Sequence, residues 1–217
     1  MKYIIGLDDA GRGPVIGSMV LAGVLIKEGE ETKLIELGAK DSKLLAPKKR
    51  KAIADALRKE YVYHAEITSP KEIDECDNLN TLEATKAAII INKLSQTIKE
   101  EILAIVDCPS VNTREWGNLL QSMIIKKDQI KVKAEHKADF NYPVVSAASI
   151  IAKETREDEV EKLTKLIGNF GSGYPSDPYT KEFLEKNLDN EKVQEHIRHS
   201  WATVKALKSK GNQKKLF

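Results

Sequence analysis

Short apolar runs rich in β-branched residues alternate along this chain with longer segments of helical periodicity. The runs that predict strands span residues 3–7, 15–27, 61–67, 102–106 and 130–134. The first two follow one another as in a hairpin, whereas the later runs are separated by helical segments. This order restricts the fold to the α/β class, with a mixed sheet flanked by helices.

Two helices can be placed from sequence signals. Asn80, with Glu83 three residues later, has the form of a capping box at the start of a helix. Pro143 suits the first turn of a long helix that runs to about residue 167. The serine and alanine residues at 146–149 would let this second helix pack close to a sheet.

Length and composition limit the class of protein. A chain of 217 residues with 41% hydrophobic residues predicts one domain with a small appendage. No stretch approaches the roughly 20 apolar residues that span a bilayer, and acidic residues follow the N-terminus too soon for a signal peptide. Cys76 and Cys108 lack partners at metal-ligand spacing and are expected to stay reduced. We therefore expect a soluble, cytoplasmic protein without a membrane segment.

The net charge of +2 says little about partners, but basic residues gather in two places. Residues 48–51 are all Lys or Arg, and residues 196–217 contain no Asp or Glu. Such clusters attract a phosphate backbone by releasing its counterions. Taken alone, both are better explained as a solvated helix face and a basic tail.

Four aspartates fall beside predicted strand ends or a helix start. Asp8 and Asp9 follow the first strand, Asp107 follows residues 102–106, and Asp139 precedes the small-residue helix. Ligand sites of open α/β sheets gather outside strand ends, so these carboxylates can converge. Each alone is best explained as a strand end or a helix cap, but the set favours a site for Mg²⁺ or Mn²⁺. Two such ions about 4 Å apart promote phosphodiester hydrolysis by activating a water and stabilising the leaving oxygen.

Asp8 and Asp9 are not equivalent in this prediction. Neighbouring side chains of a regular strand point to opposite faces, so both reach one site only if the strand bends or ends there. The glycines of the following segment, Gly11-Arg12-Gly13-Pro14, allow such a bend. Of the two, Asp8 is the preferred candidate for the metal site.

The glycine-rich segment itself predicts a tight loop. A dinucleotide-binding fingerprint fits it poorly, because the spacing differs and a strand rather than a helix follows. A loop whose bare backbone approaches a sugar–phosphate closely fits better.

Residues 6–17, GLDDAGRGPVIG, closely resemble the N-terminal signature of ribonuclease HII, the type 2 ribonucleases H. Further motifs recur in the family's order: DSK at 41–43, a strand-ending Asp107, HKAD at 136–139 and SGYPSDP at 172–178. The resemblance covers residues 3–203 and is most like archaeal members.

The resemblance implies a ribonuclease H-like fold, in which a five-stranded mixed sheet is flanked by helices and followed by a C-terminal helical extension. We accordingly expect a catalytic domain at residues 1–187 and the extension with its basic tail at residues 188–217. The implied activity is endonucleolytic hydrolysis of the RNA strand of RNA–DNA hybrids, and cleavage 5′ of ribonucleotides embedded in duplex DNA, leaving 3′-hydroxyl and 5′-phosphate ends. Such an enzyme serves RNA primer removal and ribonucleotide excision in DNA replication and repair.

The resemblance also implies roles for single residues. The catalytic acids, which would hold Mn²⁺ or Mg²⁺, are Asp8, Asp9, Asp107 and Asp139. The residues expected to bind substrate are Gly11, Arg12, Gly13, Lys43 and Tyr174. The loop and Tyr174 would read the junction of a ribonucleotide with the next deoxyribose, since the 2′-hydroxyl distinguishes RNA from DNA locally. Without the resemblance, Tyr174 is a surface aromatic in a turn and Lys43 is a surface lysine.

Two features depart from the family pattern. Asp9 stands where the family has Glu, which keeps the charge but shortens the reach by about 1.5 Å and bears on activity and metal preference. The tail with Gln213, Leu216 and Phe217 is an incomplete version of the sliding-clamp-binding motif of archaeal relatives. A basic tail that binds nothing is the simpler explanation of it, and we expect a monomer.

Three hypotheses stay open at this point. The chain is an active hybrid-specific endonuclease, a binding module that has lost catalysis through Asp9, or a metal-dependent phosphatase of small molecules. The basic runs and the loop with Tyr174 speak against the third, because a small substrate needs no extended phosphate track. A cleavage assay separates the first two.

Overall fold

A computed structural model describes residues 2–39 and 45–214 of the chain. Its contacts divide the chain into two compact units, each built from three segments. The first unit comprises residues 1–10, 20–66 and 78–155, and the second comprises residues 11–19, 67–77 and 156–217. Lys43 with the rest of the DSK motif, and Leu216 and Phe217 of the tail, lie outside the described residues.

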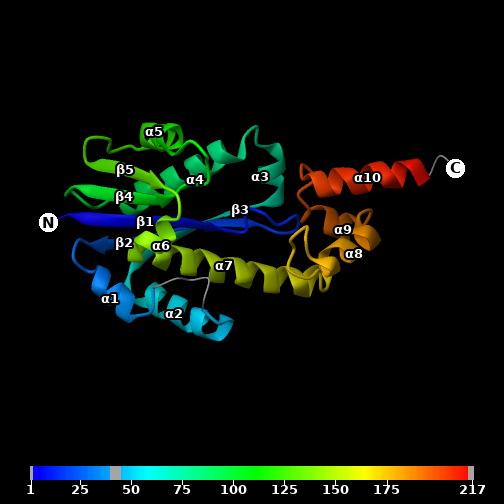
Figure 1. Ribbon diagram of the computed structural model, residues 1–217, viewed down its shortest axis with the longest axis horizontal. Coiled ribbons are helices and arrows are strands. Elements are labelled where there is room, and N and C mark those ends of the chain that lie inside the picture. Colours follow the sequence, from blue (N-terminus) through cyan, green and yellow to red (C-terminus); the bar gives the residue numbers. More distant parts are fainter. Residues whose placement is uncertain (1, 40–44, 215–217) are drawn as a thin grey trace. The chain divides into compact units, whose positions relative to one another are not determined.

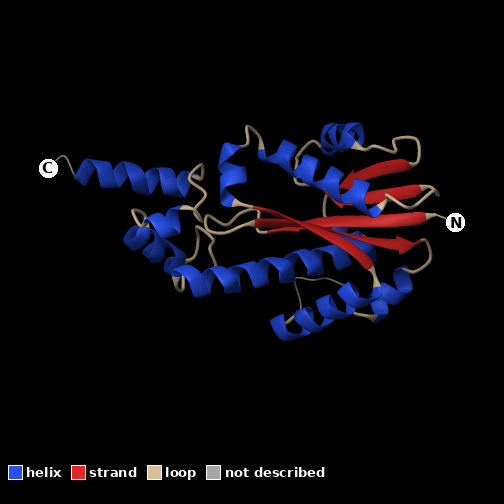
Figure 2. Ribbon diagram, turned by 180° about the vertical axis from the view of Figure 1, so that it is seen from behind, coloured by secondary structure: helices blue, strands red, loops and turns tan. Residues whose placement is uncertain are grey.

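The first unit is built on a five-stranded sheet with the strand order β3-β2-β1-β4-β5. Figure 2 shows the strands of this sheet in red. The strands are β1 (Tyr3–Ala10), β2 (Met19–Lys27), β3 (Val62–Thr68), β4 (Ile102–Asp107) and β5 (Ile130–Glu135). β1 pairs antiparallel with β2 and parallel with β4, and β4 pairs parallel with β5. The predicted mixed sheet is confirmed, and all five predicted runs contribute a strand.

Helices cover both faces of this sheet (Figure 1). They are α1 (Glu31–Glu36), α2 (Pro47–Glu60), α4 (Leu79–Leu94), α5 (Thr113–Met123), the short α6 (Ala138–Asn141) and the first part of α7 (Pro143–Ile167). One apolar core joins β1 and β4 to α4 and α5, and the other joins β2 to α1, α2 and α7. The apolar residues of β2 alternate between these two cores, as the pleat of a strand requires.

Helix α7 lies very close to β1, and a glycine makes this approach feasible. A Cβ built on Gly6 would lie 2.4 Å from the carbonyl carbon of Val144, closer than any side chain tolerates. The predicted start at Pro143 and end at Ile167 are both confirmed. Small residues at this point therefore bring the first turns of α7 to the same region of the strand as Asp8.

The start of α4 differs from its prediction. Asn78, rather than Asn80, caps the helix, because its side-chain oxygen accepts the backbone N–H groups of Asn80 and Thr81. Glu83, the expected partner of a capping box, is 1% exposed and lies in the interior. The capping box was wrong because two asparagines two residues apart offer the same local signal.

The second unit is mainly helical. It contains α3 (Pro70–Glu75), the part of α7 from Arg156 onward, α8 (Pro178–Asn187), α9 (Glu191–Gln194) and α10 (Ala202–Lys214). Its core includes Ile16, Phe170, Leu184 and Val204. The predicted boundary between residues 187 and 188 stays a prediction. Within the described ranges, no helix has the length and apolar character needed to cross a membrane.

Candidate functional site

Three of the predicted acids converge in the first unit. One carboxylate oxygen from each of Asp8, Asp107 and Asp139 lies within 4.8 Å of the other two. Leu7 of β1 pairs with Val106 of β4, so the aspartates that follow them are neighbours across a parallel ladder. Asp8 and Asp139 are buried, and Asp107 is half-buried at the end of β4.

Asp139 reaches this cluster through a sharp turn at Lys137. Lys137 has φ 58° and ψ 35°, and among the described residues it is the one non-glycine residue with positive φ. This left-handed conformation is unfavourable for an ordinary side chain. It starts α6 and directs the N–H of Ala138 to Oδ1 of Asp107, at 3.1 Å. The turn therefore orients Asp107 and brings Asp139, two residues after Lys137, into the cluster.

The electrostatics of the cluster favour a bound cation. Burial raises the pKa of Asp8 well above its ordinary value, and the charges of Asp9 and Asp107 raise it further, while a hydrogen bond from Ser149 acts in the opposite direction. Like charges held this closely in a buried site repel one another. Three carboxylates with only oxygen donors suit Mg²⁺ or Mn²⁺. The residues present thus fit a divalent cation held by Asp8, Asp107 and Asp139.

Asp9 does not belong to this group of three. β1 does not end at Leu7, as predicted, but continues to Ala10, and Asp9 pairs with Leu21 of β2 in regular register. The regular register directs the side chains of Asp8 and Asp9 to opposite faces. Asp9 still influences Asp8 through its charge, and its N–H donates to Oδ1 of Asp8 at 2.8 Å. A direct role of Asp9 in metal binding stays a prediction.

The predicted substrate loop lies in the second unit and is held by a buried arginine. The guanidinium of Arg198 donates to the carbonyl oxygens of Gly11 at 2.6 Å, Arg12 at 2.7 Å and Gly17 at 3.0 Å. The indole N–H of Trp201 donates to the carbonyl of Gly13 at 3.2 Å, and its ring lies 5.1 Å from the guanidinium carbon of Arg198. These contacts direct the loop carbonyls toward the interior of the unit and fix the loop backbone.

Sequence reasoning missed this function of Arg198 and Trp201. It placed Arg198 in a basic segment, explained as a tail, and gave Trp201 no contact. In the structure the whole of Arg198 is buried. No local signal in the sequence marks this arginine, because its hydrogen-bond acceptors lie more than 180 residues away in the chain.

Tyr174 lies in the same unit and next to the loop. A Cβ built on Gly13 would lie 3.3 Å from the Tyr174 ring, and the guanidinium of Arg156 lies 5.5 Å from the ring centroid. The segment around Tyr174 is fixed by Asp177, which accepts the N–H and hydroxyl of Ser172. These hydrogen bonds lower the pKa of Asp177 to about 2. Gly13 and Tyr174, both predicted to read the substrate, are therefore close neighbours.

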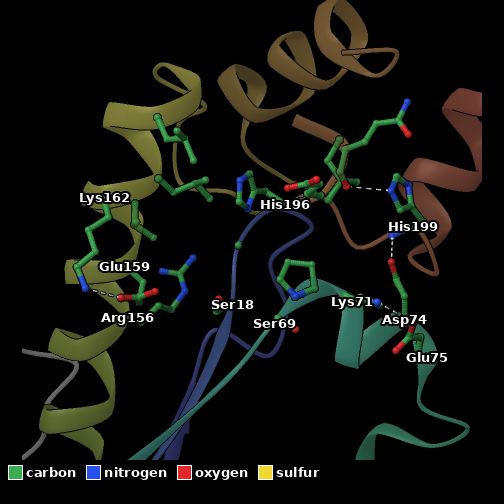
Figure 3. Close-up of a pocket in the computed structure, with 18 residues that line it drawn as sticks. Ser18, Ser69, Lys71, Asp74, Glu75, Arg156, Glu159, Lys162, His196 and His199 are labelled. Atoms are coloured by element: carbon green, nitrogen blue, oxygen red, sulfur yellow. Dashed lines mark hydrogen bonds and ion pairs between the residues drawn. The ribbon is translucent and has the colours of Figure 1, made fainter. Parts of the chain in front are cut away.

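A cavity of about 870 Å³ lies elsewhere in the second unit, between α3, the second part of α7 and residues 194–199 (Figure 3). Asp74 of α3 accepts the backbone N–H groups of His199 at 2.7 Å and Ser200 at 2.8 Å and so links α3 to the start of α10. Acidic and basic side chains are mixed around the cavity. Among the described residues, the group of His, Cys, Asp or Glu with metal-ligating spacing is that of Asp8, Asp107 and Asp139.

Comparisons of the sequence and of the structure with known proteins point to the same family. Residues 5–204 match the family model described as Ribonuclease HII. The ribonuclease HII of Methanococcus maripaludis strain C6 is 42% identical over 220 residues, which cover 100% of this chain and 91% of the relative. The crystal structure of ribonuclease H2 from Pyrococcus horikoshii OT3 aligns with a TM-score of 0.86 and 38% identity, over 97% of this chain and 99% of that one. The structure of a PCNA:RNase HII complex from Archaeoglobus fulgidus aligns with a TM-score of 0.81 and 39% identity, over 92% and 95% of the two chains.

Proposed function

The chain belongs to the ribonuclease HII family, and we propose that Asp8, Asp107 and Asp139 form its hydrolytic centre. As a ribonuclease H, it is an endonuclease that cleaves the RNA strand of RNA–DNA hybrids. The observation that carries the assignment of the centre is the approach of the three carboxylates to within 4.8 Å at adjacent strand ends. Membership in the family also agrees with the ribonuclease H-like fold expected from the sequence.

The activity of this family depends on divalent cations, and Asp8, Asp107 and Asp139 would hold them here. Two ions, Mn²⁺ or Mg²⁺, would activate the attacking water and stabilise the leaving oxygen, which gives 3′-hydroxyl and 5′-phosphate ends. Other groups of the chain orient the carboxylates. The hydrogen bond between Ser149 and Asp8 and the N–H of Ala138 on Asp107 hold the two carboxylates in place.

The finer substrate specificity is cleavage 5′ of a single ribonucleotide in duplex DNA. Gly11, Arg12, Gly13 and Tyr174 would read the ribonucleotide and the next deoxyribose, and Lys43 would contact a phosphate. The proximity of Gly13 to the Tyr174 ring and the three hydrogen bonds from Arg198 support this proposal, because a reading site needs a fixed geometry. Primer removal and ribonucleotide excision in DNA replication and repair are the corresponding roles.

A cleavage assay tests the function. Duplex DNA with one ribonucleotide, and a continuous RNA–DNA hybrid, are incubated with the protein and Mg²⁺, Mn²⁺ or EDTA. We expect metal-dependent cuts in both substrates, on the 5′ side of the single ribonucleotide. Binding without cutting in either metal would favour a module that has lost catalysis, and hydrolysis confined to small phosphomonoesters would favour a phosphatase.

Replacing Tyr174 tests the junction role. Tyr174→Ala should reduce cleavage at a single ribonucleotide more than cleavage within a long RNA stretch, because the long stretch requires no recognition of the following deoxyribose. Initial rates on both substrates measure the difference. Tyr179→Ala is the matched control, since Tyr179 is a 73%-exposed tyrosine of the same unit. Equal losses on the two substrates would make the function of Tyr174 structural.

Lengthening Asp9 tests whether its shorter side chain limits the reaction. Asp9→Glu should raise the cleavage rate, most clearly with Mg²⁺, because this ion demands near-ideal octahedral geometry. Rates with Mg²⁺ and Mn²⁺ are compared with those of Asp55→Glu, the same change at an exposed position of α2. A lower rate for Asp9→Glu would mean that the site is adapted to the shorter acid.

A sliding clamp is the proposed protein partner of a monomeric enzyme. The support is the relative whose solved structure is a complex with PCNA, together with Gln213, Leu216 and Phe217 in this tail. An incomplete motif predicts weak binding, in the micromolar range or above, which is about −8 kcal/mol or less favourable. Calorimetry against the cognate clamp should give heat with the intact chain, and no heat once residues 213–217 are removed. Unchanged heat after truncation would exclude the tail as the contact.

A further inference from the structure

The segment that carries Asp139 runs from the end of β5 to the start of α7, and side chains join its two ends. β5 ends at Glu135, and Tyr142 directly follows α6. The hydroxyl of Tyr142 accepts a hydrogen bond from the ammonium of Lys133 at 2.6 Å and donates one to Oε2 of Glu135 at 2.8 Å. Lys133 and Glu135 also form an ion pair, with 2.9 Å between Nζ and Oε1. This Lys133–Glu135–Tyr142 triad therefore ties the end of α6 to β5.

The triad is linked to two of the proposed metal ligands through the backbone. Glu135 pairs with Asp107 across the ladder of β4 and β5, and its carbonyl accepts the N–H of the residue after Asp107 at 2.9 Å. Tyr142 follows the helix that carries Asp139, and its N–H donates to the carbonyl of Ala138 at 2.9 Å. The N–H of Ala138 in turn donates to Oδ1 of Asp107. A displacement of Tyr142 would therefore reach both Asp107 and Asp139.

The segment depends on contacts from outside itself. The left-handed backbone at Lys137 is unfavourable, and such a conformation persists only where the surrounding structure fixes it. Helix α6 has four residues, too few to be stable through its own hydrogen bonds. The ring of Tyr142 packs against the core that contains β2 and α7, and its hydroxyl reaches β5. Tyr142 thus holds α6 from two sides.

The triad constrains position without adding net charge. The hydrogen bonds to Lys133 and Tyr142 lower the pKa of Glu135, and those to Tyr142 and Glu135 raise the pKa of Lys133. Both groups therefore keep their charges at neutral pH, and hydrogen bonds to charged groups are shorter and stronger than those between neutral groups. Because the two charges cancel, the triad acts on the carboxylates mainly through their placement.

We propose that Tyr142, held by Lys133 and Glu135, is a positioning residue of the metal centre. It keeps Asp107 and Asp139 together as ligands of a divalent cation. Groups that orient metal ligands contribute to metal affinity although they do not touch the ion. The proposal rests on the proposed function, because it concerns the same carboxylates. None of the three residues of the triad was among the site residues predicted from the sequence.

Binding of Mn²⁺ without substrate tests the proposal, with Tyr142→Phe as the main variant. The change keeps the ring and the net charge but removes the hydroxyl that joins α6 to β5. Calorimetry should show Mn²⁺ affinity about tenfold weaker, the lower end of the loss for groups that orient metal ligands. The Mg²⁺ concentration for half-maximal cleavage of a hybrid should rise by a similar factor, and saturating Mg²⁺ should restore the rate. Tyr61→Phe is the matched control, since Tyr61 is also partly buried against the same core.

Lys133→Met separates position from charge. Loss of a cation near the acids would by itself strengthen Mn²⁺ binding, whereas loss of the hydrogen bond to Tyr142 should weaken it. We expect weaker binding than in the wild type. Lys131→Met, the same change at an exposed position of β5, removes an equal charge and should not weaken binding.

Three results would overturn the proposal. They are wild-type Mn²⁺ affinity in a Tyr142→Phe variant that is folded by circular dichroism, slower cleavage by this variant with an unchanged Mg²⁺ midpoint, and equal or tighter Mn²⁺ binding by Lys133→Met. Failure of the proposed function gives a different result. A wild type that binds Mn²⁺ but cuts no hybrid refutes that function, while the comparison of Mn²⁺ affinities still decides the role of Tyr142.

Discussion

Replacing Asp107 by asparagine should lower the cleavage of RNA–DNA hybrids by at least about a hundredfold, the scale of loss when a group that acts on the reacting charge is removed. Asparagine keeps the shape of the side chain and retains an oxygen that can accept the N–H of Ala138, now 3.1 Å from Oδ1 of Asp107. The turn that brings in Asp139 should therefore persist. The variant loses the negative charge, and with it one of three carboxylates for a divalent cation.

The same variant separates a catalytic from a structural role of Asp107. The charge of Asp107 raises the pKa of Asp8, which means that the two acids repel each other in the folded protein. Its removal should leave the free energy of unfolding without metal unchanged or higher, as measured by urea denaturation. Hybrid binding in EDTA should also persist. Near-normal turnover would remove Asp107 from the centre, and a large loss of stability would make its role structural.

Asp128→Asn provides the matched control. Asp128 is an exposed aspartate of the same unit, so its substitution changes the net charge equally. If both variants lose activity to the same extent, the loss reflects long-range charge rather than the centre. We expect Asp128→Asn to cleave at the wild-type rate.

The convergence of Asp8, Asp107 and Asp139 was predictable because it depends on local pattern and simple topology. Apolar runs identified the strands, and acids at the ends of adjacent parallel strands lie near each other by the geometry of the ladder. The small residues that bring α7 against Gly6 were also visible in the sequence. For these features, short-range signals and the final fold agree.

The side-chain direction of Asp9 could not be predicted in the same way. It depends on where the pairing of β1 with β2 stops, and that pairing continues through Ala10 and Val20. The glycines at 11 and 13 indicate a loop but do not say how many residues earlier the ladder ends. The choice between Asn78 and Asn80 as the cap of α4 failed for a similar reason, since the start of the helix is set by packing as well as by local sequence.

Arg198 shows a stronger limit of sequence reasoning. Its burial depends on carbonyl groups more than 180 residues away in the chain, and no local pattern reports them. A run without acidic residues predicted solvation for every basic side chain in it. Tertiary contacts instead place one of these cations in the interior, where carbonyl oxygens replace water as its hydrogen-bond partners.

Arg198→Met should destabilise the protein on the order of 3–5 kcal/mol. The substitution keeps an apolar stem of similar length but removes the donors for the carbonyls of Gly11, Arg12 and Gly17. Each buried acceptor left without a donor costs about 1–3 kcal/mol. Urea denaturation measures the loss, and Lys205→Met, the same change on the exposed surface of α10, should leave stability unchanged.

Arg198→Met should lose cleavage activity beyond what its lower stability explains. At a temperature where Arg198→Met is still folded, cleavage at a single ribonucleotide should fall more than cleavage in a long RNA stretch, because the loop that would read the junction is no longer fixed. Arg198→Lys should cleave at a single ribonucleotide at a rate between those of the wild type and Arg198→Met. One ammonium group cannot reproduce the planar set of donors that a guanidinium gives to separate carbonyls. If Arg198→Met unfolds at the same urea concentration as Lys205→Met, the three hydrogen bonds do not hold the loop. If it is less stable but cuts both substrates with equal losses, Arg198 supports the fold of the second unit without a specific effect on recognition.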